Sequence, residues 1–152
     1  MLTPEEAAAF MEKPFAFVER AGVKAIVMEP RRIKLRLPME GNTNHIGSIY
    51  AGALFTVAEL PGGALFLTTF DVSRFYPVLK AMNIRFRRPA FTDVTVDVAL
   101  TEDEAQRIAD EAERQGKSEF TLSAEVRDAD DRVVAETEGI YQLRKTETEV
   151  QS

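Results

Sequence analysis

The segment from residue 46 to residue 70 most constrains the fold, because it is long, apolar and carries a single charge, Glu59. It predicts a helix with apolar residues on all sides, which is typical of a helix enclosed by other structure. Its length would also cross a bilayer, but Pro61-Gly62-Gly63 interrupts the middle and basic flanks are missing. We therefore expect a buried core helix and no membrane partner.

Apolar and polar residues alternate in four other stretches, with the period of a half-buried strand. These stretches lie at 32–37, 82–86, 94–100 and 120–126. A further strand is expected before Pro30, and another over 132–143, which would form a hairpin across the turn-rich residues 128–131. About six half-exposed strands and one long buried helix predict an α+β fold, in which an antiparallel sheet wraps around the helix.

Two further helices are predicted outside this core. Thr3-Pro4-Glu5-Glu6 has the residues of a capped helix start, and we expect this short N-terminal helix to end near Gly22. A second helix, with acids in its first turn, is expected as a solvated insertion at 102–116. The length of 152 residues favours one domain, which we place at 3–145, with fraying from residue 145 onwards.

Composition excludes several kinds of chemistry. The chain has no cysteine and a single histidine, His45, so we expect neither a metal site nor a thiol nucleophile, and no separate cofactor. The net charge of −6 argues against nucleic acid as a partner. The N-terminus lacks the basic start and apolar run of a secretory signal, so we expect a cytoplasmic protein.

Glu59 is the candidate catalytic residue. A carboxylate in apolar surroundings costs several kcal/mol unless it is paired, hydrogen-bonded or protonated, and the neighbouring sequence supplies no cation. Burial would raise its pKa toward neutrality, which suits a general base. The alternative is a structural glutamate, held by backbone donors freed by Pro61 or reaching solvent.

The start of the same helix, at 47–52, offers the second half of a site. Free backbone N–H groups and the positive end of the helix dipole can hold the oxyanion that forms when a thioester carbonyl is attacked. Ala51 and Glu59 are eight residues apart, about 12 Å along a helix. One carbonyl cannot touch both, so a site that uses both residues must combine two copies of the chain at a symmetric dimer interface.

Residues 44–59 read Asn-His-Ile-Gly-Ser-Ile-Tyr-Ala-Gly-Ala-Leu-Phe-Thr-Val-Ala-Glu. They resemble the asparagine, glycine, histidine-glycine-glycine and acidic signature of hot-dog-fold acyl-CoA thioesterases of the phenylacetate-pathway type. Residues 82–90 resemble the strand after the helix in that family, so the resemblance spans most of residues 31–143. It implies a hot-dog fold, hydrolysis of acyl-CoA thioesters with coenzyme A as part of the substrate, and homodimers or homotetramers.

Carried over by position, the resemblance implies three catalytic residues. Glu59 matches the carboxylate that acts as base or nucleophile, Asn44 the residue that orients water or the thioester, and Ala51 the backbone oxyanion donor. The chain departs from the family at Tyr50, where histidine is usual, at Ala51, where glycine is usual, and at Leu79, where serine or threonine often assists.

Other residues are expected to contact the substrate. A basic cluster near residues 80–88, which includes Arg85, could bind the phosphates of coenzyme A, although outward positions of a strand are normally charged. The acyl pocket would be walled by aromatic residues that are equally expected in the core, namely Phe55, Phe66, Phe75 and Tyr76. The candidate substrate-binding residues are His45, Tyr50, Gly52, Lys80, Arg87 and Arg88.

Two other functions stay open. The spacing of His45 and Glu59 resembles that of the acid–base pair in fatty-acid dehydratases, which favours a hot-dog dehydratase or hydratase acting on acyl-CoA or acyl-carrier substrates. The histidine-phenylalanine-proline motif of those enzymes is missing. The residues at Tyr50 and Leu79 favour a third function, a non-catalytic acyl-binding dimer.

Overall fold

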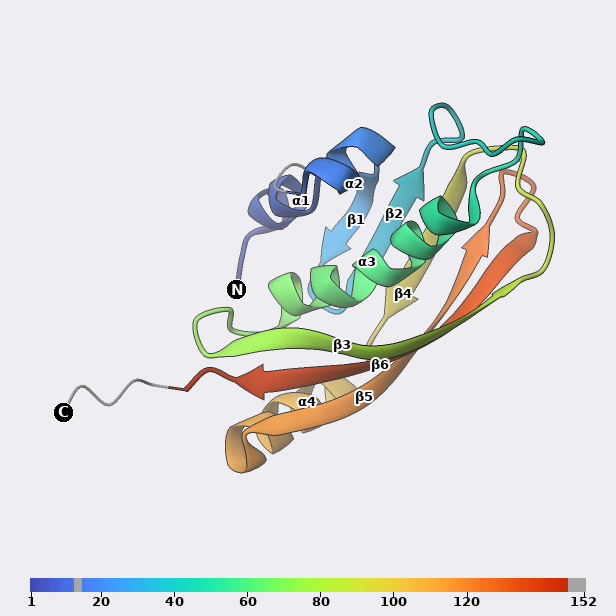
Figure 1. The fold of residues 1–152 in the computed structure, drawn as a ribbon. Helices are drawn as coiled ribbons and strands as arrows, with labels where there is room; N and C mark the ends of the chain where they lie inside the picture. The colour runs from blue at the N-terminus through green and yellow to red at the C-terminus, as the bar shows by residue number, and fades with distance from the viewer. Residues whose placement is uncertain (13–14, 148–152) are drawn as a thin grey trace.

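The computed structural model describes residues 1–12 and 15–147, in which a long helix, α3, lies against one face of a six-stranded antiparallel sheet (Figure 1). The strand order is β1-β2-β4-β5-β6-β3. The strands are β1 (Lys24–Glu29), β2 (Arg32–Leu37), β3 (Phe75–Phe86), β4 (Val94–Ala99), β5 (Lys117–Arg127) and β6 (Val133–Lys145). The helices are α1 (Pro4–Glu12), α2 (Ala16–Ala21), α3 (Ala51–Thr69) and α4 (Glu102–Gln115).

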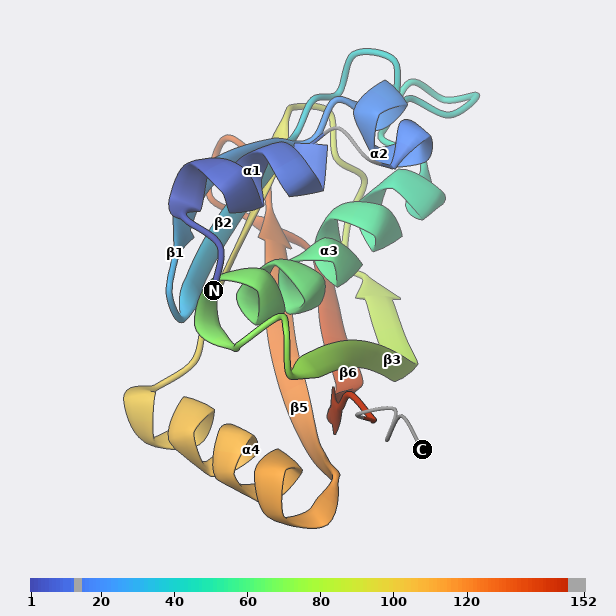
Figure 2. The same cartoon turned by 90° about the vertical axis from the view of Figure 1, so that its left-hand side faces the viewer.

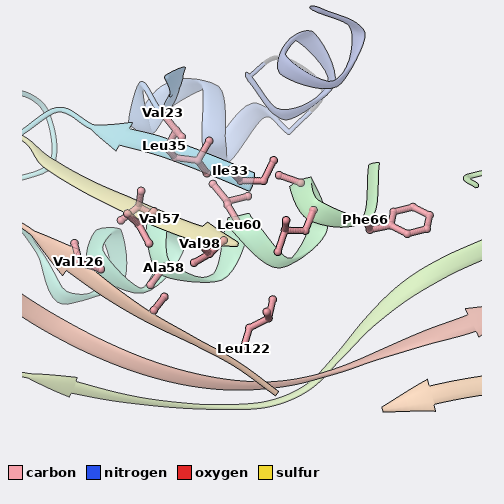
Figure 3. Close-up of a cluster of buried hydrophobic side chains, with 14 of the residues drawn as sticks. Val23, Ile33, Leu35, Val57, Ala58, Leu60, Phe66, Val98, Leu122 and Val126 are labelled. Carbon is pink, nitrogen blue, oxygen red and sulfur yellow. The ribbon is translucent and has the colours of Figure 1, made fainter. Parts of the chain in front are cut away.

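The core forms between α3 and the inner face of the sheet. Val57 and Ala58 of α3 are buried together with Leu122 of β5, Val98 of β4 and Ile33 of β2, the cross-strand partner of Val98 (Figure 3). The strands deliver these side chains because their apolar residues alternate with polar ones that face outward. The predicted α+β arrangement, with about six strands around one long buried helix, is confirmed.

The burial of α3 distinguishes it from a membrane span. This helix has the length and composition to cross a bilayer, but 67% of its apolar window is buried inside the fold. Pro61 lies within the helix and does not end it. The helix is therefore the core element that the sequence predicts.

The edge strand β3 is longer than the predicted strand at 82–86, since it begins at Phe75. It pairs only with β6, in antiparallel register, and a β-bulge interrupts the pairing between Leu79 and Ala81. Because its other edge has no neighbouring strand within the described residues, Met82 and Ile84 stay half-buried and Phe86 is exposed.

The N-terminal segment differs from the expected single helix that ends near Gly22. The predicted capping box at its start is confirmed, because Thr3 N–H donates to Glu6 Oε2 (2.8 Å) and Glu6 N–H donates to Thr3 Oγ1 (3.2 Å). Two helices follow, however, and α1 ends at Glu12 before Pro14, which lacks the N–H that a continuous helix needs. The second helix, α2, ends at Gly22, whose φ of 76° is left-handed.

Helix α4 has the predicted bounds but is more than a solvated insertion. Thr101 and Glu104 form a capping box at its start, and Gly116 with φ 84° ends it. It packs against β5 and β6, apart from α3 (Figure 1 and Figure 2), and Ile108 and Ala112 are fully buried. The buried side of α4, formed by Ala105, Ile108 and Ala112, extends the core, because its two alanines allow close packing. The predicted fraying from residue 145 falls mostly outside the described residues, and the Lys145 N–H still donates to the Gly116 carbonyl (2.8 Å).

Replacing Ile108 by alanine tests whether α4 belongs to the core. Loss of a fully buried isoleucine side chain should lower the free energy of unfolding by about 2–5 kcal/mol in urea titrations. The control is Arg107→Ala, at an exposed ion pair with Glu111, which should change it by about 0.5 kcal/mol or less. Equal effects of the two variants would show that α4 is peripheral.

Candidate active site

The loop before α3 is organised by Asn44. Its Oδ1 accepts hydrogen bonds from the N–H groups of Ile46 (3.0 Å) and Ser48 (3.2 Å), and its Nδ2 donates to Ser48 Oγ (2.9 Å). Gly47 has a left-handed φ of 85°. Residues 46–50 are therefore a loop, and the helix expected from residue 46 begins at Ala51. The apolar composition of this segment concealed the turn, which depends on the Asn44 side chain and Gly47.

The N-terminus of α3 presents free backbone donors. Tyr50 is the N-cap residue and supplies no side-chain cap, while its carbonyl accepts the N–H of Ala53 (3.0 Å). Within the described residues, no acceptor is recorded for the N–H groups of Ala51 and Gly52. The Tyr50 ring lies over Gly52, where an added Cβ would come within 2.6 Å of it. An anion at this helix end would meet two N–H groups, the positive end of the dipole and the Tyr50 ring.

Glu59 lies two turns further along α3, on the least buried stripe of the helix. Ala51, Phe55, Glu59 and Gly63 follow one another at intervals of four and are all exposed or half-buried, whereas most of the helix is buried. No hydrogen bond or ion pair of the Glu59 carboxylate is recorded within the described residues, and burial raises its pKa above the ordinary value. A half-buried, unpaired carboxylate of this kind suits proton transfer near neutral pH.

Tyr141 of β6 supports the backbone at Glu59. Its phenolic O–H donates to the Glu59 carbonyl oxygen (3.1 Å), and its ring stacks on Phe120 with centroids 5.9 Å apart. A Cβ at Gly62 would come within 2.1 Å of this ring, and one at Gly139 within 2.5 Å. Both glycines therefore make room for Tyr141. Burial, and then the charge of Glu59, raise the pKa of the Tyr141 phenol.

Sequence reasoning did not identify Tyr141. In the sheet it is the cross-strand partner of Leu79, the position at which a serine or threonine hydroxyl was noted as missing. A hydroxyl group on this part of the sheet thus comes from the neighbouring strand. The sequence does carry one signal for Tyr141. In β6 it follows Gly139 by two residues, so both residues face the inner side of the sheet, and a glycine within a strand often marks a close approach.

The predicted basic cluster does not meet Glu59 within one chain. Lys80 pairs with Glu119 (3.0 Å) and Arg87 with Glu136 (2.7 Å), on the face of the sheet opposite α3. Arg88 is exposed just after β3. Arg87 also lines a groove of about 1060 Å³ on that outer face, whose lining carries charges of both signs. The sheet therefore separates Lys80 and Arg87 from the open stripe of α3.

The remaining candidates are scattered. His45 is exposed in the loop, and no hydrogen bond or ion pair within residues 1–12 and 15–147 joins it to Glu59. Phe66 and Phe75 are buried core residues, and Tyr76 is exposed. Of the four expected pocket aromatics, only Phe55 lies on the stripe beside Glu59. The structure thus places Phe55 and Glu59 on one open stripe of α3, with Tyr141 at the backbone of Glu59 and the helix start two turns away.

Known structures share this architecture. A crystal structure of a protein of unknown function from Pseudomonas aeruginosa, described as a probable thioesterase, is 50% identical, covers 95% of this chain and 97% of its own, and superposes with a TM-score of 0.92. A protein of unknown function from Chlorobaculum tepidum (18% identity, 95% and 98% coverage, TM-score 0.77) and a thioesterase from Haemophilus influenzae (12%, 99% and 96%, TM-score 0.75) share the fold.

The curled sheet around α3 is thus the hot-dog fold of the thioesterase superfamily, as the sequence resemblance implied. Within it, the chain belongs to the family described as a domain of unknown function, DUF4442, whose model matches residues 7–141. No curated protein sequence matches the chain.

Replacing Glu59 by glutamine tests its environment through stability. Because burial raises the pKa of Glu59, the folded state binds more protons than the unfolded state between the ordinary glutamate pKa, about 4.3, and the raised value. Ionised Glu59 therefore destabilises the fold, and this penalty is complete above the raised pKa. Denaturant titrations should show Glu59→Gln to be more stable than the parent at about pH 7, with the difference vanishing below about pH 4.

The control for this titration is Glu138→Gln, at an exposed carboxylate of β6. It should show no comparable gain at neutral pH. A Glu59→Gln variant with the same stability difference at both pH values would show that the carboxylate is not held in a desolvated site.

Proposed function

We propose that this protein hydrolyses acyl-CoA thioesters, with Glu59 as the catalytic carboxylate. The observation that carries the proposal is the half-buried, unpaired carboxylate on a stripe of α3 that begins with free N–H groups. The Pseudomonas aeruginosa relative, described as a probable thioesterase, supports hydrolysis of thioesters. The acyl-CoA class of substrate rests on the sequence resemblance at 44–59.

In this proposal, the Ala51 N–H, with that of Gly52 beside it, holds the thioester carbonyl oxygen. Glu59 takes a proton from water as the water oxygen attacks the carbonyl carbon, and the oxyanion that forms is stabilised by the N–H donors and the helix dipole. The C–S bond then breaks, coenzyme A leaves as the thiolate and receives the proton from Glu59, and the carboxylic acid is released. Direct attack by the carboxylate, followed by hydrolysis of the anhydride, uses the same groups.

The distance between these groups favours a shared site. Ala51 and Glu59 are about 12 Å apart along α3, so one carbonyl would need Ala51 from one protomer and Glu59 from its partner. The long edge strand β3 offers a surface for this pairing, because it has an unpaired edge and half-buried apolar residues at Met82 and Ile84. Antiparallel pairing of two copies of β3 about a twofold axis would give a homodimer with two equivalent sites.

The other candidates take supporting roles in this proposal. Asn44 holds the loop that positions the start of α3, and Tyr50 flanks the oxyanion site. Arg88, just after β3, is the basic residue best placed for coenzyme A phosphates, since Lys80 and Arg87 pair with carboxylates. His45, exposed in the loop, would contact the coenzyme moiety. A single domain over 3–145 and a cytoplasmic location stay predictions.

No observation specifically supports either alternative, the dehydratase or the non-catalytic acyl-binding dimer. A dehydratase would need His45 close to Glu59, and no contact between them is recorded within the described residues of one chain, so this function would also need a partner's histidine. A non-catalytic binder would not need an unpaired carboxylate on an otherwise apolar stripe.

Thiol release from acyl-CoA substrates tests the proposed reaction. Glu59→Gln should lower kcat about a hundredfold or more, because glutamine fills the same space and cannot accept the proton. His45→Ala is the matched test of the dehydratase function and should leave kcat for hydrolysis largely unchanged, because in this proposal His45 contacts only the coenzyme moiety. If Glu59→Gln were as active as the parent, or if His45→Ala abolished activity, the mechanism would be wrong.

Mixing two variants with impaired activity tests the shared site. Ala51→Pro removes the N–H donor at the first helical position, where proline is well tolerated, and the Tyr50 ψ of 138° suits a following proline. In a mixed dimer with Glu59→Gln, one site would combine an intact Glu59 with an intact Ala51 N–H. Refolding the two variants together in equal amounts should restore about a quarter of the parent activity. No recovery above the separate variants would place both groups in one protomer.

A further inference from the structure

Helix α3 contains three glycines, and two of them are explained by neighbours within the chain. A Cβ at Gly52 would meet the Tyr50 ring at 2.6 Å, and one at Gly62 would meet the Tyr141 ring at 2.1 Å. At both positions a larger residue would displace an aromatic side chain. These glycines are required by the packing of the chain itself.

Gly63 is different, because nothing within the described chain requires a glycine there. A Cβ added at Gly63 would have no heavy atom within 4 Å. The residue lies in the interior of α3, and its φ is not left-handed, so the backbone conformation does not require glycine either. Glycine is among the least favourable residues in a helix interior. A molecule outside the described chain that approaches the backbone closely would account for a glycine at this position.

The position of Gly63 indicates what approaches it. It follows Glu59 by one turn on the same stripe, about 6 Å further along the helix axis. The next residues on this side of the helix, Phe66 and Leu67, are buried, so the stripe ends there. Apart from Glu59, the stripe from Ala51 to Gly63 carries no charged side chain. A ligand that starts at Glu59 and lies over Gly63 would therefore meet an apolar helix surface that ends at Phe66 and Leu67.

We propose that Gly63 is a specificity-determining residue, over which the acyl chain of the substrate lies. The thioester carbonyl would be held near Glu59, and the acyl chain would run toward Phe66 across the bare backbone of Gly63. The substrate class is thus a thioester whose acyl group extends at least one helical turn beyond the carbonyl. This inference rests on the proposed thioesterase function, and a partner chain over Gly63 is the competing occupant.

Binding of S-alkyl-CoA thioethers, from methyl to hexadecyl, tests the assignment without turnover. In calorimetric titrations, Gly63→Ala should lower the affinity for long alkyl chains relative to the methyl thioether about tenfold, because the added methyl group occupies the path of the chain. Gly63→Leu should move the loss to shorter chains. Ser123→Thr, which adds a methyl group on the opposite face of the sheet, should leave the dependence on chain length unchanged.

Stability separates this effect from damage to the fold. Gly63→Ala should raise the thermal midpoint by about 2–4 °C, since alanine favours helix and meets no neighbour, whereas Gly62→Ala should lower it through the clash with Tyr141. Loss of affinity in a variant that is more stable cannot come from unfolding.

Three results would overturn the assignment: an equal change for short and long thioethers, no binding of any thioether by the parent, or dissociation of the oligomer by Gly63→Ala in sedimentation experiments. The last result would assign the space over Gly63 to a partner chain. A parent that binds thioethers with the expected length dependence but releases no thiol from acyl-CoA would overturn the proposed function and leave the Gly63 assignment standing.

Discussion

The burial of α3 is the constraint on which the rest of the structure depends. A helix with apolar residues on almost every side must be covered on almost every side, and one strongly curved sheet achieves this for most of its surface. Coverage by a single chain is incomplete along the stripe from Ala51 to Gly63. That stripe contains the only charge of the helix, so the geometry that builds the core also leaves one carboxylate between the core and the surface.

Much of the fold could be predicted because periodicity records burial directly. The alternation in β2, β4 and β5 predicted which side chains face α3, and the capping residues at Thr3 and Thr101 marked the starts of α1 and α4. The errors arose where one side chain or one backbone conformation overrode composition. Asn44 and Gly47 fold the segment before Ala51 into a loop, although its residues are as apolar as those of the helix.

The candidate site was predicted in part for the same reason. Glu59 and the helix start could be recognised because a charge in an apolar run and a glycine near a helix start are local signals. Tyr141 could not, because its contact with the Glu59 carbonyl joins residues from α3 and β6 that only the sheet topology brings together. The face of the sheet that carries the basic residues near β3 could not be predicted, because a sequence does not reveal which face of an edge strand looks toward the helix and a β-bulge shifts the alternation at Lys80.

The packing of the Tyr141 ring against two glycines has a consequence for how such a chain can diverge. Neither Gly62 nor Gly139 can gain a side chain while the ring is present, and a smaller residue at 141 would leave a cavity where the ring had been. Substitutions at the three positions must therefore occur in a particular order: a smaller residue replaces Tyr141 first, and larger residues replace the glycines afterwards. A chain halfway along this route would lack both the packing and the phenol that supports the backbone of Glu59, so the arrangement resists gradual replacement.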